Sequence, residues 1–334
     1  MKMIRMLKYL IDNIYINIAG ISAMLLSPFA DAIGSPAYWW LFGGLVLLFI
    51  FGIFDEILKN QKLSAETIHI PIVIKINDGP ESKYVMQNLI ERIEQKNALN
   101  GYETLLQKYF SLNLEDFIFE YNGSIYEFDR LMSFARIIKY NVGKIEKQFK
   151  GRVKFHVAYY RRPSIGFLIG TVFRTEGVVI YQNSDFDNKF YNIAEIKNRD
   201  YKTPVKEFVK YNIENIKSDN FKDRILITIE SSSHLIAIDS SSLKNFSNII
   251  KIKLIEGSTI PYDSDWTIYA QEIYTILNEI QTIYKKIVIA HAMPEGLAVI
   301  LGMALENYWN IDITQFEQND YKYVYTMNQI KYFH

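Results

Sequence analysis

The chain has 334 residues, of which 49% are hydrophobic, and its 37 basic side chains balance 37 acidic ones. A net charge of zero disfavours a general polyanion-binding surface, so long DNA or RNA is not predicted as a partner, whereas a local basic pocket stays allowed. The absence of cysteine excludes disulfides, thiolate catalysis and cysteine-ligated metal sites. The length suits two soluble domains, or one domain with membrane segments.

Two apolar segments near the N-terminus predict a transmembrane hairpin at residues 1–58. The spans run over about residues 9–30 and 37–54, and the second contains 18 residues without a charge. A helix of that length is about 27 Å long, close to a hydrocarbon core of about 30 Å. A signal peptide fits less well because a second span follows directly. A buried core helix fits less well because Trp39 and Trp40 open the charge-free run.

The charge distribution predicts the topology of this hairpin. Basic residues precede the first span and follow the second, and none lies between the two spans. The positive-inside rule then places both termini in the cytoplasm. Asp12, Asn13 and Asn17 interrupt the first span. They could either line a pore in an oligomer or lie at the level of the lipid headgroups.

Strands and helices alternate after a polar linker at residues 59–66. Strands are predicted at Thr67–Ile76, Phe117–Tyr121 and Arg224–Ile229, and helices at Glu81–Lys96, Tyr102–Phe110, Ile125–Phe149, Trp266–Tyr284 and from about Val205. This alternation indicates two fused α/β sandwiches, which we place at residues 67–200 and 201–334.

A strand–proline–helix unit occurs twice, about 130 residues apart, and organises the chain. The copies are Arg152–Tyr191 and Lys286–Tyr325, and in each a buried strand leads into a helix with proline at its start and glycine within it, followed by two strands. Gly296 and Gly302 would let the second helix approach other backbone closely. The shared order favours an internal duplication over chance. It predicts a pseudo-two-fold pocket between the halves, suited to a ligand with repeating anionic groups.

Several side chains follow the predicted strands at the carboxyl edge, where α/β proteins bind ligands. Arg161 and Arg162 precede a helix N-terminus and could clamp phosphate, or could be a solvated surface pair. The serine run after the strand at Arg224–Ile229 could hold phosphate or form a solvated turn. His291 could contact a ligand or be a satisfied turn histidine. The full set of predicted ligand-binding residues is Arg161, Arg162, Ser164, Ser231, Ser232, Ser233, His234, His291, Met293, Pro294, Phe316 and Tyr321.

No catalytic residue, metal or cofactor is predicted. The chain has no G-x-S-x-G elbow, no Walker P-loop and no G-x-G-x-x-G motif. The histidines show neither H-x-x-x-H nor H-E-x-x-H spacing, which disfavours a metal site. A protein that binds a ligand is therefore favoured over an enzyme.

The pattern resembles the SAVED domain, a fusion of two CARF-like halves that acts as a sensor in bacterial anti-phage systems, chiefly CBASS. The residues that carry the resemblance are His291-Ala292-Met293-Pro294, Gly296, Gly302, Ile311–Gln315 and Tyr321, and it covers about residues 67–334. Met293 stands where the family has the glycine before the proline, which leaves the shape of this turn open. The resemblance implies an α/β fold of two fused Rossmann-like halves, here preceded by the two-helix transmembrane hairpin.

The same resemblance implies a function. It implies a cyclic tri- or tetranucleotide ligand made by a partner nucleotidyltransferase, and a homo-oligomer formed when that ligand binds. With the hairpin, the chain looks like a transmembrane-SAVED effector of the bacterial inner membrane, which disrupts the lipid bilayer and causes abortive infection. Two alternatives are a membrane-tethered hydrolase or nuclease that acts on the cyclic nucleotide, through residues 231–234 or His291, and a passive membrane anchor that recruits another effector.

Overall fold

The computed structural model describes residues 14–26, 42–54, 67–99, 101–184, 187, 189–197, 200–220 and 222–330. Contacts divide the chain into two units, each described by itself below. One consists of Met1–Thr67 with Gly101–Asn113, and the larger one consists of Ile68–Asn100 with Leu114–His334.

The smaller unit does not support a transmembrane hairpin. It contains helices α2 (Ile14–Leu26) and α5 (Tyr102–Phe110), and residues 42–54 are also helical. Across these described residues, and in the rest of the described chain, no helix is both long enough and apolar enough to cross a membrane.

The predicted hairpin is therefore wrong as part of the fold. The same finding contradicts the predicted two-span localisation in the bacterial inner membrane with both termini in the cytoplasm. The lipid bilayer as a partner stays a prediction. Asp12, Asn13 and the outer parts of both predicted spans lie outside the described residues, and Asn17 is exposed on α2.

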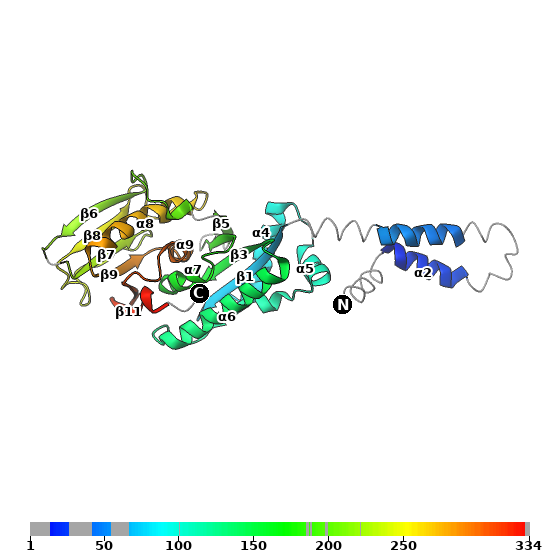
Figure 1. The fold of residues 1–334 in the computed structure, drawn as a ribbon, viewed down its shortest axis with the longest axis horizontal. Coiled ribbons are helices and arrows are strands. Elements are labelled where there is room, and N and C mark those ends of the chain that lie inside the picture. The colour runs from blue at the N-terminus through cyan, green and yellow to red at the C-terminus, as the bar shows by residue number, and fades with distance from the viewer. Residues whose placement is uncertain are drawn as a thin grey trace. The chain divides into compact units, whose positions relative to one another are not determined.

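The larger unit contains two mixed β-sheets (Figure 1). The strands are β1 (Ile68–Ile76), β2 (Ile118–Tyr121), β3 (Val153–Tyr160), β4 (Val178–Asn183), β5 (Phe190–Ile196), β6 (Tyr211–Lys217), β7 (Arg224–Glu230), β8 (Ile249–Leu254), β9 (Lys286–Ala292), β10 (Ile311–Glu317) and β11 (Asp320–Thr326). The helices are α4 (Ser82–Asn97), α6 (Phe128–Phe149), α7 (Pro163–Val172), α8 (Trp266–Ile283) and α9 (Glu295–Ala304), with short 3-10 turns at Leu114–Phe117, Asp200–Lys202 and Met327–Ile330.

The two sheets repeat one topology. The first has the order β2-β1-β3-β4-β5, and the second has the order β11-β10-β9-β7-β8-β6. Read from β8, the second sheet gives β8-β7-β9-β10-β11, which is the order of the first. In both sheets the first four of these strands are parallel and the last is antiparallel. The strand–proline–helix repeat in the sequence thus lies at the same place in each sheet, which supports an internal duplication.

The central strands form the core of each sheet. Seven of the nine residues of β1 are buried, and six of the seven in β7 are buried. Such near-continuous apolar strands belong to sheets that are covered on both faces, because an exposed face would carry polar residues at alternate positions. Predicted strands and helices here are confirmed to within a few residues at their ends.

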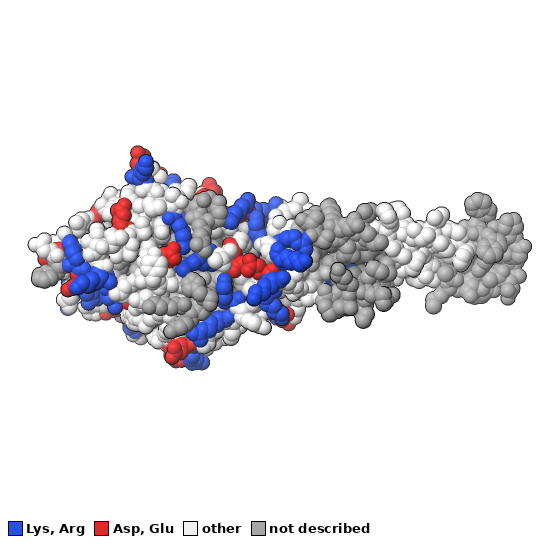
Figure 2. All heavy atoms as spheres, viewed as in Figure 1, with Lys and Arg blue, Asp and Glu red and all other residues white. Residues whose placement is uncertain are grey.

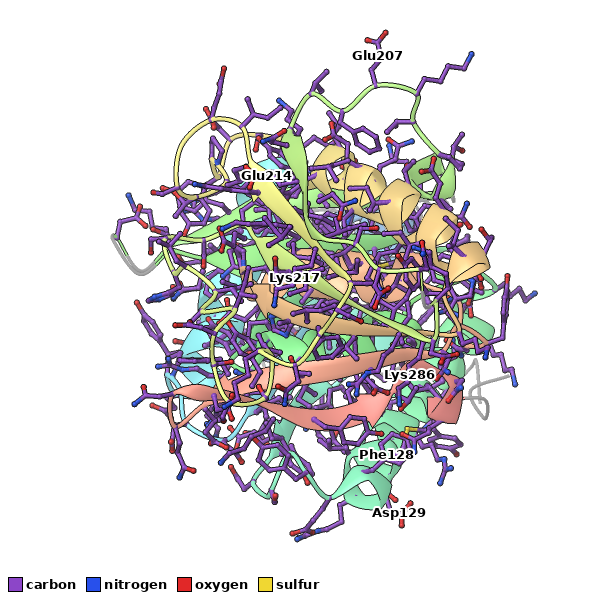
Figure 3. All side chains as sticks on the ribbon, turned by 90° about the vertical axis from the view of Figure 1, so that its left-hand side faces the viewer. Phe128, Asp129, Glu207, Glu214, Lys217 and Lys286 are labelled. Atoms are coloured by element: carbon purple, nitrogen blue, oxygen red, sulfur yellow. The ribbon has the colours of Figure 1, made fainter. Side chains whose placement is uncertain are left out.

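Strand β6 replaces a helix that was predicted to begin near Val205. Glu272, which is buried on α8, accepts backbone N–H groups of Val209, Lys210 and Tyr211 at 2.9–3.0 Å. Those N–H groups are therefore unavailable for helix formation, and the chain continues antiparallel to β8. All β6 residues after Tyr211 are exposed, and Figure 3 shows two of them, Glu214 and Lys217, on this edge of the second sheet.

Helices α7 and α9 join the two halves through backbone contact. They lie side by side in Figure 1. A Cβ atom added at Gly170 would collide with the carbonyl oxygen of Val299, and one added at Gly302 would collide with the carbonyl oxygen of Phe167. The close approach predicted for Gly302 is confirmed. Gly296 instead faces side chains, those of Ile193 and Gln182.

This crossing generates the first prediction. Gly170→Ala or Gly302→Ala should lower the free energy of unfolding by about 1–3 kcal/mol or more, because two helix backbones must separate to admit the methyl group. Denaturant unfolding followed by circular dichroism measures the change. The matched control is Gly143→Ala on α6, where nothing lies within 4 Å of the added Cβ, and where alanine should raise stability by roughly 0.5–1 kcal/mol. Equal effects at Gly143 and Gly170 would contradict the backbone contact.

Candidate functional site

A pocket of about 490 Å³ lies at the carboxyl end of the first sheet. It is lined by Ile76, Asn77, Asp78, Arg161, Arg162, Pro163, Glu295 and Gln315. The first three come from the end of β1 and the turn after it, the next three from the turn after β3 and the start of α7, and the last two from α9 and β10 of the second half. The carboxyl edge of a mainly parallel sheet is where α/β proteins bind ligands, and this volume falls within the range of small-molecule sites.

Two consecutive arginines form one wall of this pocket in an unusual backbone conformation. Arg161 and Arg162 have φ angles of 66° and 57°, in the left-handed region. Each such non-glycine residue costs of order 1–3 kcal/mol, and such residues cluster at functional sites. The turn is held at Arg162, whose carbonyl oxygen accepts the Tyr159 hydroxyl and the Ile165 N–H, both at 2.8 Å.

The two arginines differ in their surroundings. The Arg162 guanidinium lies 3.6 Å from the Glu317 carboxylate. That carboxylate also accepts the Tyr126 hydroxyl at 2.6 Å, which is the main cause of a lowered pKa at Glu317. Arg161 is exposed. One guanidinium is thus oriented by an ion pair while the other faces solvent at the pocket.

Two glutamines link each half of the larger unit to the first turn of the other half's helix. Gln182 on β4 donates to the Glu295 carboxylate at 2.9 Å and accepts the Gly296 N–H at 2.7 Å. Gln315 on β10 accepts the buried Ser164 hydroxyl at 2.7 Å. Because β4 and β10 hold the same place in their sheets, these bonds are reciprocal. They fix the second-half wall of the pocket, which consists of Glu295 and Gln315.

The serine-rich turn lies outside the pocket. The Ser231 hydroxyl is buried and hydrogen-bonded at 2.7 Å to the hydroxyl of Tyr211, the first residue of β6. Ser232 is half-buried, whereas Ser233 and His234 are exposed. None of the four lines the pocket, and their contact with a ligand stays a prediction.

His291 is buried inside the larger unit. Its ring centroid lies 5.6 Å from that of Phe167 on α7, and its Nε2 atom has no hydrogen-bond partner among the described residues. Burial lowers the pKa of His291 to about 4, against a smaller opposing effect of a hydrogen bond to the Thr314 backbone. The imidazole is therefore neutral at physiological pH. It packs between a strand of one half and a helix of the other, and it does not line the pocket.

The remaining predicted residues also do not line the pocket. Met293 is buried and Pro294 is the N-cap of α9. Phe316 is exposed, and its ring centroid lies 5.1 Å from that of Tyr321. Tyr321 is buried in an apolar cluster of the second half. Of the predicted set, the pocket brings together Arg161 and Arg162 only, while Ser164 supports it through Gln315.

Six pocket residues were absent from the predicted set, namely Ile76, Asn77, Asp78, Pro163, Glu295 and Gln315. Sequence signals for two of them existed. Asp78 lies in an Asn-Asp-Gly-Pro turn that follows the first strand of the sheet, and Glu295 is the single charge in an otherwise apolar stretch from Pro294 to Leu305. Among the residues that the structure describes, no cluster of histidine and carboxylate side chains could hold a metal ion.

Comparison with known families decides the family of this chain. The family model described as "SMODS-associated and fused to various effectors sensor domain", SAVED, matches residues 138–328. The chain belongs to the SAVED family. A comparison with curated proteins found no match.

Solved structures share the fold of this SAVED protein. One is an Acinetobacter baumannii Cap4 SAVED/CARF-domain containing receptor with the cyclic trinucleotide 3'3'3'-cAAA, at 13% identity and a TM-score of 0.51. The same receptor with 2'3'3'-cAAA gives 14% identity and a TM-score of 0.50. Both alignments cover 84% of this chain and 56% of the receptor. The chain thus spans little more than half the length of these receptors, and the likeness shows the fold.

The strained arginine turn of this SAVED protein generates a second prediction. Arg161→Gly should be more stable than Arg161→Ala by about 1 kcal/mol, because both variants lose the guanidinium but only glycine adopts a φ of 66° without strain. Thermal and urea unfolding of the two variants measure the difference. The same pair at Ser133, an exposed position within α6, should show the opposite order, since alanine is the better helix former by about 1 kcal/mol. Alanine more stable than glycine at residue 161 would contradict the assigned backbone conformation.

The buried imidazole generates a third prediction. Above pH 6.5, His291 is neutral in both the folded and the unfolded chain and contributes no pH dependence. Below pH 6.5 the imidazole of the unfolded chain is protonated, whereas that of the folded chain stays neutral down to its pKa of about 4. The free energy of unfolding should therefore decrease as the pH is lowered from 6.5 to 4, by about 3 kcal/mol from this group at pH 4. Unfolding of the wild type and of His291→Gln between pH 7.5 and 4 measures the difference, and parallel pH profiles would contradict it.

Proposed function

We propose that this SAVED protein is a sensor that binds a cyclic oligonucleotide in a CBASS-like anti-phage defence system. The observation that carries the proposal is the arginine pair, Arg161 and Arg162, held in left-handed backbone on the wall of a pocket of about 490 Å³. The family is a family of sensor domains, and a structure that shares the fold holds a cyclic trinucleotide. A strained cationic turn at the carboxyl edge of a sheet suits a phosphate ligand.

The pocket supplies three features that suit a phosphodiester. The guanidinium groups of Arg161 and Arg162 can each donate two hydrogen bonds to one phosphate. Helix α7 starts directly after them at Pro163, so its positive dipole end faces the same region. The pocket volume fits roughly one nucleotide, so the remaining nucleotides of a cyclic tri- or tetranucleotide lie outside it.

The proposal includes the origin of the ligand and the response to it. A partner nucleotidyltransferase makes the cyclic oligonucleotide, and a ring whose other nucleotides stay outside the pocket can contact a second copy of the chain. On that ground the proposal includes ligand-driven association into a homo-oligomer. A catalytic role is less well supported, because the Ser231 hydroxyl is buried against Tyr211 and the His291 ring is packed against Phe167.

This function generates the fourth prediction. Arg161→Ala and Arg162→Ala should each weaken binding of a cyclic oligonucleotide at least about tenfold, because each removes a charge-assisted contact worth roughly 1.5–3 kcal/mol. Isothermal titration with cyclic triadenylate, cyclic tetra-adenylate and their 2'–5'-linked forms measures the change. The matched control is Arg136→Ala, an exposed arginine on α6 outside the pocket, which should bind as the wild type does. Wild-type affinity in both pocket variants would contradict the proposal, and so would the absence of binding of any ring to the wild type.

A further inference from the structure

The pocket is not a simple anion site, because it contains as many carboxylates as guanidinium groups. Asp78 and Glu295 line it together with Arg161 and Arg162. A carboxylate in the same pocket repels phosphate, and it does so more strongly in a partly desolvated pocket than in water. An occupant that was all phosphate would therefore fit worse than one that carries hydrogen-bond donors beside its phosphate. Figure 2 shows the same interspersion of basic and acidic side chains across one face of the larger unit.

Glu295 is held in place by protein groups on one side only. Its Oε2 atom accepts a hydrogen bond from Gln182 Nε2 at 2.9 Å. The side-chain oxygen of the same glutamine, Oε1, accepts the Gly296 N–H at 2.7 Å. Within the part of the chain that the structure describes, no residue donates to Glu295 Oε1. An ionised carboxylate only accepts hydrogen bonds. Glu295 thus offers an oriented, acceptor-only group to the occupant of the pocket.

We propose that Glu295, oriented by Gln182, reads the exocyclic amine of one nucleobase of the ligand, with Asp78 as a second acceptor. This inference rests on the proposed function and names the class of base that the pocket takes. Adenine, cytosine and guanine each carry an exocyclic amine that can donate to a carboxylate, whereas uracil presents carbonyl oxygens at both of its exocyclic positions. The phosphate contacts of Arg161 and Arg162 set affinity without regard to the base.

The structure assigns different roles to the three kinds of residue. Glu295 and Asp78 determine specificity, because a carbonyl oxygen placed against a carboxylate is left unpaired and repelled. Gln182 is a positioning residue that acts through Glu295. A glutamine at residue 295 would keep the length of the side chain and its acceptor oxygen while adding an N–H₂ donor, so it could pair with the uracil carbonyl that the glutamate rejects.

The test compares matched rings that differ only in the base. The 334-residue chain is titrated with cyclic triadenylate and cyclic triuridylate, and with the two corresponding tetranucleotides, in 3'–5' and mixed 2'–5' linkages. The wild type should bind the adenine ring at least about tenfold more tightly than the uracil ring of the same size and linkage. Glu295→Gln should bring that ratio close to one, and Asp78→Asn and Gln182→Ala should lower it partially.

Two controls separate specificity from affinity and from folding. Glu279→Gln makes the same chemical change at an exposed position on α8 and should keep the wild-type ratio. Arg161→Ala should weaken both rings by the same factor and leave the ratio unchanged. Thermal unfolding confirms that each variant is folded. If Glu295→Gln does not fold, Asp78→Asn, which changes an exposed turn, tests the proposal in its place.

The outcomes distinguish this inference from the function on which it rests. Equal binding of adenine and uracil rings by the wild type, or an unchanged ratio in both Glu295→Gln and Asp78→Asn, overturns base reading while leaving the sensor intact. Failure of every ring to bind the wild type overturns the proposed function, and base reading with it. If Glu295→Gln weakens binding of the adenine ring and of the uracil ring by the same factor, the carboxylate maintains the structure of the pocket and has no role in specificity.

Discussion

The larger unit depends on one contact, the crossing of α7 and α9, whose backbones meet at Gly170 and Gly302. A Cβ atom at Gly170 or Gly302 would occupy space that belongs to the partner helix's backbone. Because each helix follows the third strand of its own half, this crossing fixes the carboxyl edge of one sheet against that of the other. The starts of both helices then come within reach of Gln182 and Gln315. The pocket wall contributed by the second half exists because of that proximity.

The duplicated topology does not produce a symmetric site. Asn77 directly follows β1 and lines the pocket, whereas Ser231 directly follows β7 and does not. The difference comes from β6, a strand that the first sheet lacks. The hydroxyl of its first residue, Tyr211, is hydrogen-bonded to the Ser231 hydroxyl at 2.7 Å. An extra edge strand has therefore filled one of two equivalent positions, and the chemistry of the pocket is concentrated at the other.

The sequence was sufficient for those features that depend on local pattern. β-branched runs predicted β1 and β7 nearly to their ends, and the paired arginines before a proline predicted the cationic wall. Features set by distant partners were missed. The segment that leads into β6 was predicted as a helix, and the prediction is wrong because Glu272, about 60 residues later in the chain, accepts hydrogen bonds from its N–H groups. The transmembrane prediction is wrong because, among the residues that the structure describes, no helix is both long enough and apolar enough to cross a membrane.

His291 and Glu295 illustrate the remaining difficulty. Both were visible as polar residues beside a helix start, yet one turns into the core against Phe167 and the other lines the pocket. Only the position of α7, which belongs to the other half, decides between these fates. The same position makes the site preformed. The cost of placing Arg161 and Arg162 in left-handed backbone is met during folding, by packing and by the bonds to the Arg162 carbonyl oxygen. A ligand that meets an already ordered wall loses less of its binding energy to ordering the protein.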